Sequence, residues 1–114
     1  MAGHDLLKIS VARQFSPDPG PRYARQGPNS GETFRRMLVR KLQEADTIEV
    51  DLDGTYGFGS SWLDEVFGGL IKYENMSADD VRRRVKVKSA ADQSYLITVD
   101  EAIEMARREP AQAA

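Results

Sequence analysis

The chain has 114 residues, with no cysteine and a single histidine, His4. The absence of cysteine excludes disulfides, zinc–thiolate sites and cysteine nucleophiles. His4 stands near the amino terminus, where chains commonly fray, which argues against a histidine triad or a histidine metal centre. We therefore expect neither a metal ion nor a cofactor.

Long apolar runs are also missing. No stretch approaches the ~20 apolar residues that a membrane-spanning helix requires. The first residues, MAGHDLLK, lack the apolar core of a signal peptide. The net charge of −2 comes without the strong basic excess and aromatic platforms of a nucleic-acid module. These absences predict a cytoplasmic protein that binds neither membranes nor nucleic acid.

The remaining composition is that of an ordinary globular protein, with 40% apolar and 30% charged residues. The length suffices for one hydrophobic core, so we predict one domain over residues 1–110 and a disordered tail over 111–114. Charge is distributed unevenly. Residues 1–42 hold eight Lys and Arg against three acidic residues, whereas residues 43–80 hold ten acidic residues against one Lys. Solvated faces and local ion pairs are the simplest interpretation.

The spacing of apolar residues predicts alternating strands and helices. Period-two alternation predicts strands at Leu6–Ala12, Thr47–Leu52 and Val85–Lys88. Helical spacing predicts helices beginning at Asn29 or Ser30, at Ser61–Trp62, at Ser77 and at Asp92. Within the last helix, Tyr95–Val99 also reads as a strand, and Thr98 with Glu101 could begin a shorter helix. This order predicts an α/β fold with a small sheet that is at least partly parallel and has helices packed on it.

Two segments stand outside this regular pattern. Phe15–Ser30 holds four of the five prolines, and structureless loops of this length are often functional. The Gly-rich turn DGTYGFGSS follows the second predicted strand, and binding sites in α/β sheets favour that end of a strand. Ser61 and Asp64 have capping-box spacing, which predicts Ser61 as the N-cap and leaves Ser60 exposed on the loop. A phosphate on Ser60 would then face the positive end of the helix dipole.

The segment IEVDLDGTYGFGSSWLDEVFGGLI resembles the central strand, turn and helix of STAS domains, the anti-sigma-factor antagonist class. The resemblance places Ser60 at the phosphorylatable serine of that class. Gly59 stands where those domains have Asp, and Trp62 where they have Gly.

A closer resemblance is to the bacterial STAS-like domain family DUF4325. It rests on a proline-glycine loop with an Arg, a G-x-x-S-G-E helix start, and a D-G-x-x-G-x-G-S-S turn that leads into E-x-F-G-G-L. The matching residues are Arg22, Gly27, Ser30, Gly31, Glu32, Asp51, Asp53, Gly54, Gly57, Gly59, Ser60, Ser61, Glu65, Phe67, Gly68, Gly69 and Leu70. The resemblance implies a STAS-like fold and association with histidine-kinase-like ATPases.

Our first hypothesis is therefore a regulatory module without enzymatic activity, which binds a protein partner through Gly54–Glu65 and is switched by phosphorylation of Ser60. Trp62 would anchor the interface if exposed. The residues expected to take part in binding are Arg22, Arg25, Glu32, Asp51, Asp53, Gly57, Gly59, Ser60, Ser61, Trp62 and Glu65.

Three alternatives stay open. Exposed backbone N–H groups of the Gly-rich turn, with Arg22 and Arg25, could bind a phosphate or nucleotide. Ser60 could act as a nucleophile, with nearby carboxylates binding Mg²⁺. An edge strand and the Gly68–Gly69 pair could support a homodimer.

Overall fold

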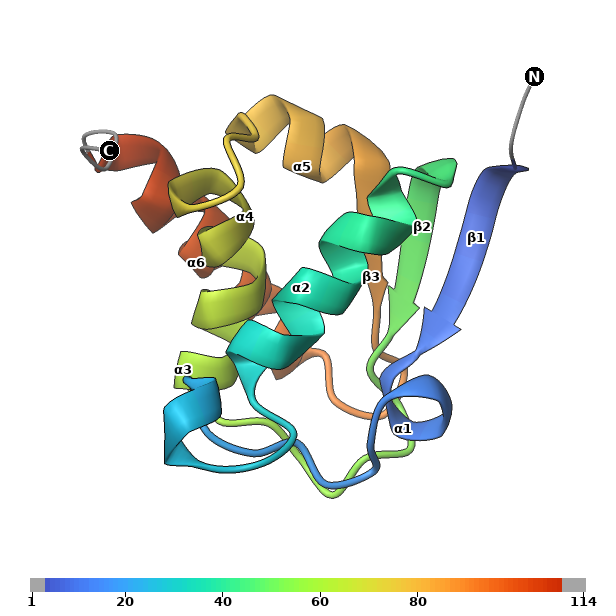
Figure 1. Cartoon of the computed structure of the whole chain (residues 1–114), viewed down its shortest axis with the longest axis vertical. Coiled ribbons are helices and arrows are strands. Elements are labelled where there is room, and N and C mark those ends of the chain that lie inside the picture. Colours follow the sequence, from blue (N-terminus) through green and yellow to red (C-terminus); the bar gives the residue numbers. More distant parts are fainter. Residues whose placement is uncertain (1–3, 110–114) are drawn as a thin grey trace.

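Three parallel strands form the sheet of the computed structural model, which describes residues 4–109 (Figure 1). The strands are β1 (His4–Ser10), β2 (Ala45–Asp51) and β3 (Val85–Lys88), in the order β1-β2-β3. Both pairings are parallel, because each connection between strands includes a helix that returns the chain to its starting end. The predicted α/β fold is confirmed, and the sheet is wholly parallel. The tail predicted for residues 111–114 lies outside the described residues.

The helices α2 to α6 gather on one side of the sheet, and the short α1 lies at its lower end (Figure 1). Their bounds are α1 Val11–Gln14, the 3₁₀ helix η1 Ala24–Gln26, α2 Gly31–Leu42, α3 Ser60–Leu63, the π-helix η2 Asp64–Gly68, α4 Gly69–Lys72, α5 Ala78–Arg84 and α6 Ser94–Arg108. The elements α3, η2 and α4 follow one another without a break, so Ser60–Lys72 forms one continuous helical segment.

The sheet has one apolar face and one polar face. Val50 is fully buried on the helix side, and its register partner Ile9 is 1% exposed. On the other face, Lys8, Glu49 and Lys86 lie opposite one another across the three strands. Parallel sheets are usually covered on both faces. Here charges of alternating sign allow the second face to remain in water.

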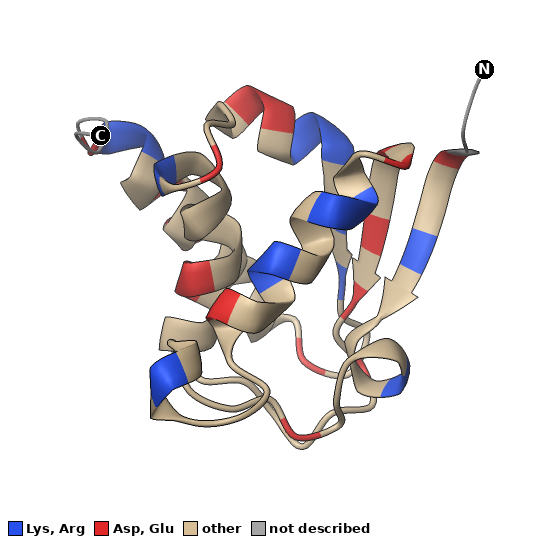
Figure 2. Ribbon diagram, viewed as in Figure 1, with Lys and Arg blue, Asp and Glu red and all other residues tan. Residues whose placement is uncertain are grey.

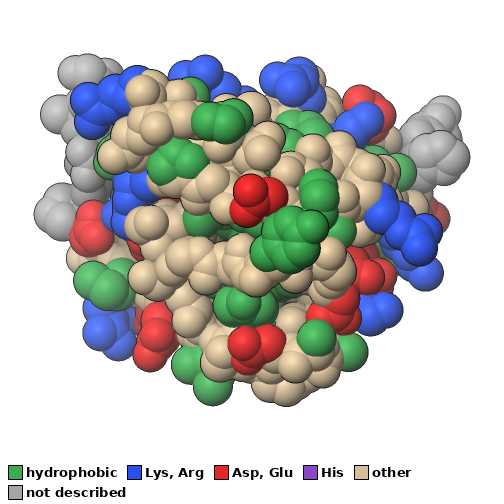
Figure 3. Space-filling view, turned by 90° about the horizontal axis from the view of Figure 1, so that it is seen from below, with side chains coloured by type: hydrophobic (Ala, Val, Ile, Leu, Met, Phe, Trp, Pro, Cys, Tyr) green, Lys and Arg blue, Asp and Glu red, His purple; other side chains and the backbone are tan. Residues whose placement is uncertain are grey.

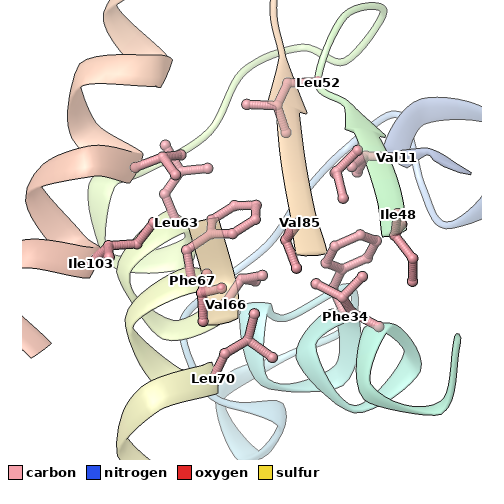
Figure 4. Close-up of a cluster of buried hydrophobic side chains, with 14 of the residues drawn as sticks. Val11, Phe34, Ile48, Leu52, Leu63, Val66, Phe67, Leu70, Val85 and Ile103 are labelled. Carbon is pink, nitrogen blue, oxygen red and sulfur yellow. The ribbon is translucent and has the colours of Figure 1, made fainter. Parts of the chain in front are cut away.

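The core fills the space between the apolar sheet face and the helices (Figure 4). Phe34 and Leu38 of α2, four positions apart and therefore on one face of the helix, are fully buried. Val66, Phe67 and Leu70 of the Ser60–Lys72 segment are also fully buried. The Ser60–Lys72 segment therefore contributes a central part of the core.

The first strand ends earlier than predicted. β1 stops at Ser10, and Val11–Gln14 forms α1 instead of continuing the strand. The Ser10 hydroxyl accepts a hydrogen bond from the N–H of Arg13 (3.2 Å), and the Gln14 side chain accepts one from the N–H of Ser10 (2.7 Å). These local bonds turn the chain into a helix. The same strand includes the backbone of His4, which pairs with Ala45 rather than fraying.

The predicted helix caps are confirmed at two positions. The Ser30 hydroxyl accepts from the N–H of Thr33 (3.0 Å) and begins α2. Asn29 is excluded as the cap because its φ is 59°, outside the extended region that a cap adopts. Ser77 caps α5 by accepting from the N–H of Asp80 (3.0 Å).

The last helix begins at Ser94, so the strand interpretation of Tyr95–Val99 and the shorter helix from Thr98 are both wrong. Val99, Ile103 and Ala106 are buried at helical spacing. Burial of this stripe outweighs the strand preference of the β-branched residues.

Candidate functional site

The turn between β2 and α3 is held by its own hydrogen bonds. The Asp51 carboxylate accepts from the N–H of Asp53 (2.9 Å), which bends the chain as the strand ends. Gly54 and Gly57 adopt φ of 92° and 138°, where a side chain would be strained. The N–H of Phe58 donates to the hydroxyl of Tyr95 (3.3 Å). Asp51 and Gly57, both expected at a binding surface, therefore shape the turn.

Asp53 links this turn to the loop that follows β3. Its carboxylate accepts from the N–H groups of Ala90 (2.9 Å) and Ala91 (3.0 Å) and from the hydroxyl of Ser89 (3.4 Å). These bonds, the one from Ala91 first, lower the pKa of Asp53 below its ordinary value. Asp53, one of the residues expected at the binding surface, thus joins two loops of its own chain.

The two serines differ from their predicted places. The helix begins at Ser60, with Gly59 as its N-cap, so Ser60 lies inside the first turn and not on the loop. Ser61 is not the cap, and no side chain bonds at this cap position. The carboxylate of Asp64 binds Arg22 instead of reaching back to complete a capping box.

A groove of about 310 Å³ lies between the Ser60–Lys72 segment and α6. We call it the Ser60 groove. It is lined by Arg22, Ser60, Ser61, Asp64, Lys72, Thr98, Glu101, Ala102, Met105 and Glu109. Both serine side chains are exposed, and neither hydroxyl forms a hydrogen bond with another residue between positions 4 and 109. Free hydroxyls at this place are available to a partner or to a modifying enzyme.

A chain of ion pairs runs from this groove into the interior. Arg22 on the long loop pairs with Asp64 (2.8 Å) and Glu65 (3.3 Å). Glu65, only 3% exposed, also pairs with Arg35 of α2, which in turn binds Glu74 (2.9 Å). We call these five residues the Glu65 network. It fastens the proline-rich loop and α2 to the Ser60–Lys72 segment, so Arg22 and Glu65 have structural roles.

Trp62 is fully buried and does not anchor an exposed interface. Its ring packs against those of Phe34 and Phe58, with centroids 5.3 and 4.9 Å away. Its indole N–H donates to the carbonyl oxygen of Asn29 (3.0 Å). The apolar surface of the indole ring is thus packed inside the protein, and its N–H group has a hydrogen-bond acceptor there.

Glycines within the Ser60–Lys72 segment and at the start of α2 permit close packing. A Cβ atom on Gly31 would lie 2.8 Å from the carbonyl oxygen of Trp62. One on Gly69 would lie 2.9 Å from Cδ of Arg35, and one on Gly68 would lie 3.3 Å from the carbonyl oxygen of Ala102 in α6. The Gly68–Gly69 pair thus serves contacts within the protein.

Glu32 and Arg25 do not line the Ser60 groove. Glu32 accepts from the N–H of Ala24 (2.9 Å) and pairs with Arg36 (2.7 Å), and the bond from Ala24 lowers its pKa. Arg25 stacks over the ring of Tyr23, 5.2 Å from its centroid. Of the residues expected at the site, the structure brings together only Arg22, Ser60 and Ser61 in this groove.

The sequence did not reveal the partners that α6 contributes. Thr98, Glu101 and Met105 share one face of α6 by their spacing, but nothing in the pattern indicated that this face meets Ser60. Tyr56 was also missed. It is 84% exposed in the structure. In the sequence, its position between the glycines of a predicted turn was a readable signal.

The end of the molecule that carries this turn lies at the bottom of Figure 1 and faces the viewer in Figure 3. Acidic and apolar side chains occupy the middle of that face, and Lys and Arg lie toward its rim. Such a face suits a partner surface that is basic and apolar.

Among residues 4–109, no group of three or more His, Asp or Glu side chains is arranged to hold a metal ion. In the same part of the chain, every helix is too short or too polar to cross a membrane.

Comparison with known proteins agrees with this architecture. A family described as a STAS-like domain of unknown function (DUF4325) matches residues 30–95, more than half of the chain. The match runs from the N-cap of α2 into the first turn of α6 and so includes β2, the Gly-rich turn, the Ser60–Lys72 segment and β3. No curated protein and no solved structure matches the chain. The chain belongs to the STAS-like DUF4325 family.

Proposed function

We propose that the chain is a regulatory module that binds a protein partner through the Gly54–Gly59 turn and the Ser60 groove, with modification of Ser60 as the switch. The observation that carries this proposal is the state of the Ser60 side chain. It is exposed, lines a groove, and has a hydroxyl without a hydrogen-bond partner among the described residues. The Ser61 hydroxyl in the same groove is also exposed and without a partner among these residues, so the family resemblance, rather than the geometry alone, selects Ser60.

The partner that the family resemblance favours is a histidine-kinase-like ATPase. The acidic and apolar end face, with Tyr56 exposed on it, supports docking of a basic and apolar partner surface. Tyr56 takes the anchoring role that the sequence suggested for Trp62, since tyrosine is common among residues that dominate binding energy. A regulatory module of this kind acts by binding its partner and needs no catalytic residue of its own.

Phosphorylation of Ser60 would act on partner binding through electrostatics. The N–H of Asp64 donates to the carbonyl oxygen of Ser60, so the two side chains lie one helical turn apart. A phosphate on Ser60 would add about −1.5 to −2 charges beside the Asp64 carboxylate. It would also compete with Asp64 for Arg22. Both effects alter the groove without requiring a change in the core.

Phosphate or nucleotide binding is the second candidate, since Arg22, Ser60 and Ser61 share one groove. An anion there would have to displace the carboxylates of Asp64 and Glu65 from Arg22. Stabilisation against heat by nucleotides or inorganic phosphate, lost in Arg22→Gln, would favour this candidate over protein binding.

The experiment combines the purified chain with each histidine-kinase-type ATPase encoded in the same genome. Binding is measured by calorimetry, and phosphorylation with ATP and Mg²⁺ by mass spectrometry, with Ser61→Ala and Ser60→Ala as site controls. We expect Ser60→Asp to weaken binding by at least about tenfold. Ser60→Ala and the distant charge control Gln43→Glu should bind normally. If no ATPase binds, or Ser60→Asp binds as tightly as the unmodified chain, the proposal fails.

A further inference from the structure

A second surface lies at the outer edge of β3. A groove of about 260 Å³ follows this edge between β3 and α6, and we call it the β3-edge groove. Its lining consists of Arg82, Val85, Lys86, Val87, Leu96, Val99, Asp100 and Ile103. It shares no lining residue with the Ser60 groove, so the two surfaces can be tested independently.

The backbone of β3 offers free hydrogen-bonding groups to this groove. The N–H of Leu52 donates to the carbonyl oxygen of Lys88 (2.9 Å), so Lys88 directs its backbone groups toward β2. Successive residues of a strand direct these groups to opposite sides, so Val87 directs its N–H and C=O away from β2. Within residues 4–109, β3 pairs with β2 alone. The edge can therefore accept another strand.

On the helix side, this edge is lined by apolar side chains together with the ion pair between Arg82 of α5 and Asp100 of α6 (2.7 Å). Val85 and Val99 are each 5% exposed, Val87 and Leu96 are half-buried, and Ile97 nearby is 62% exposed. An added strand would place every second side chain over this apolar strip.

On the opposite face of the sheet, β3 presents charge of one sign. Lys86 and Lys88 are exposed, and neither forms an ion pair with another described residue, although the Lys86 ammonium donates to the carbonyl oxygen of Arg82 (2.9 Å). Glu49 and Asp51 of β2 lie beside them on one side only. Figure 2 shows basic residues where α5 runs into β3. The next strand position would therefore favour acidic side chains on this face.

We propose that β3 binds an extended segment of a partner protein, with apolar residues alternating with acidic ones, which adds to the sheet as a fourth strand. The apolar side chains enter the β3-edge groove, and the acidic ones lie opposite Lys86 and Lys88. Main-chain bonds to Val87 supply the pairing, and the alternation supplies specificity.

The other edge of the sheet provides a matched control. The N–H of Ser10 points away from β2 and is already bound by the Gln14 side chain (2.7 Å). By the same alternation, the N–H of Lys8 also points outward. Lys8→Gln thus removes a charge of the same sign from the same face at the opposite edge.

The probe is a capped eight-residue peptide that alternates valine with glutamate, compared with one that alternates valine with lysine. Binding is followed by amide chemical shifts of the full chain. We expect the glutamate peptide to shift the Val87 and Ser89 amides and to slow hydrogen exchange at Val87. The double variant Lys86→Gln/Lys88→Gln should weaken binding by about tenfold, and Lys8→Gln should leave it unchanged.

Val87→Pro removes the outward N–H without touching the bonds to β2, because proline is tolerated at a strand edge. We expect it to abolish binding, whereas Val87→Ala, which keeps the N–H, should retain part of it. If Val87→Pro does not fold, the lysine variants still decide the matter. The proposal is overturned if the glutamate peptide shifts none of these amides, if the lysine peptide binds equally well, or if Lys8→Gln weakens binding as much as the double variant. Self-association that protects β3 would overturn it in favour of a second copy of the chain.

Discussion

Replacing Glu65 with glutamine should lower the free energy of unfolding by about 3 kcal/mol. Glu65 is 3% exposed and binds Arg35, itself a buried side chain, together with Arg22. Losing one member of a buried ion pair typically costs about 3–5 kcal/mol, because the other charge stays buried without compensation. We take the lower end because Arg35 keeps Glu74 and Arg22 keeps Asp64. For a domain of this size, the loss corresponds to a fall in Tm of roughly 12 °C.

The assay is urea unfolding followed by circular dichroism, with the slope of the transition compared between variants. Glu74→Gln is the matched control, since it removes a carboxylate from the same arginine at a site that is 23% exposed. It should cost about 1 kcal/mol or less. If Glu65→Gln costs no more than Glu74→Gln, burial does not set the strength of the Glu65 network, and our account of how the loop is fastened is wrong.

Four further substitutions, one of them a control, test the local structure. Ser30→Ala should cost about 1 kcal/mol through loss of a helix cap, while Ser61→Ala should change the urea midpoint little; equal effects would contradict the observed helix start. Trp62→Phe should cost about 2 kcal/mol, because it removes the indole N–H that serves the Asn29 carbonyl and leaves a cavity, and an unchanged unfolding curve would refute that contact. The pKa of Asp53 is lower in the folded chain, so its stabilising effect is present above its unfolded pKa of about 4 and is lost as the pH falls through the folded pKa. Asp53→Asn should therefore be less stable at neutral pH and lose less stability from about pH 5 downward, which a pH series of Tm values checks.

Periodicity predicted the fold well where burial follows one regular face. The stripe of Phe34, Leu38 and Leu42 in α2 and the alternation of β2 both satisfy local geometry and core packing at once. The predicted element boundaries are wrong where a local hydrogen bond of a polar side chain determines the backbone conformation. Val11 continues the apolar pattern of β1, but Ser10 accepts from Arg13 and starts a helix that alternation cannot reveal.

The candidate site was harder to predict because several of its residues bind partners that are distant in sequence, and not the local ones that their spacing suggests. Ser61 and Asp64 have the spacing of a capping box, yet Asp64 binds an arginine 42 positions earlier in the chain. Trp62 was expected at an interface, but the loop before α2 supplies both a ring to pack on and an acceptor for its N–H. Local rules fail at such positions because tertiary contacts satisfy the same polar groups.

Gly59 shows how the structure separates a requirement of the fold from one of function. Gly54 and Gly57 on the same turn need φ values that disfavour side chains. Gly59 has φ of −76° and ψ of 151°, a conformation open to any residue, and a Cβ there would meet nothing closer than the Ser61 hydroxyl at 3.9 Å. The fold therefore does not dictate the absence of the aspartate that STAS domains carry before their serine. If Ser60 is a switch in this chain, the carboxylate nearest to it along the helix is that of Asp64, one turn further on and paired with Arg22 (2.8 Å).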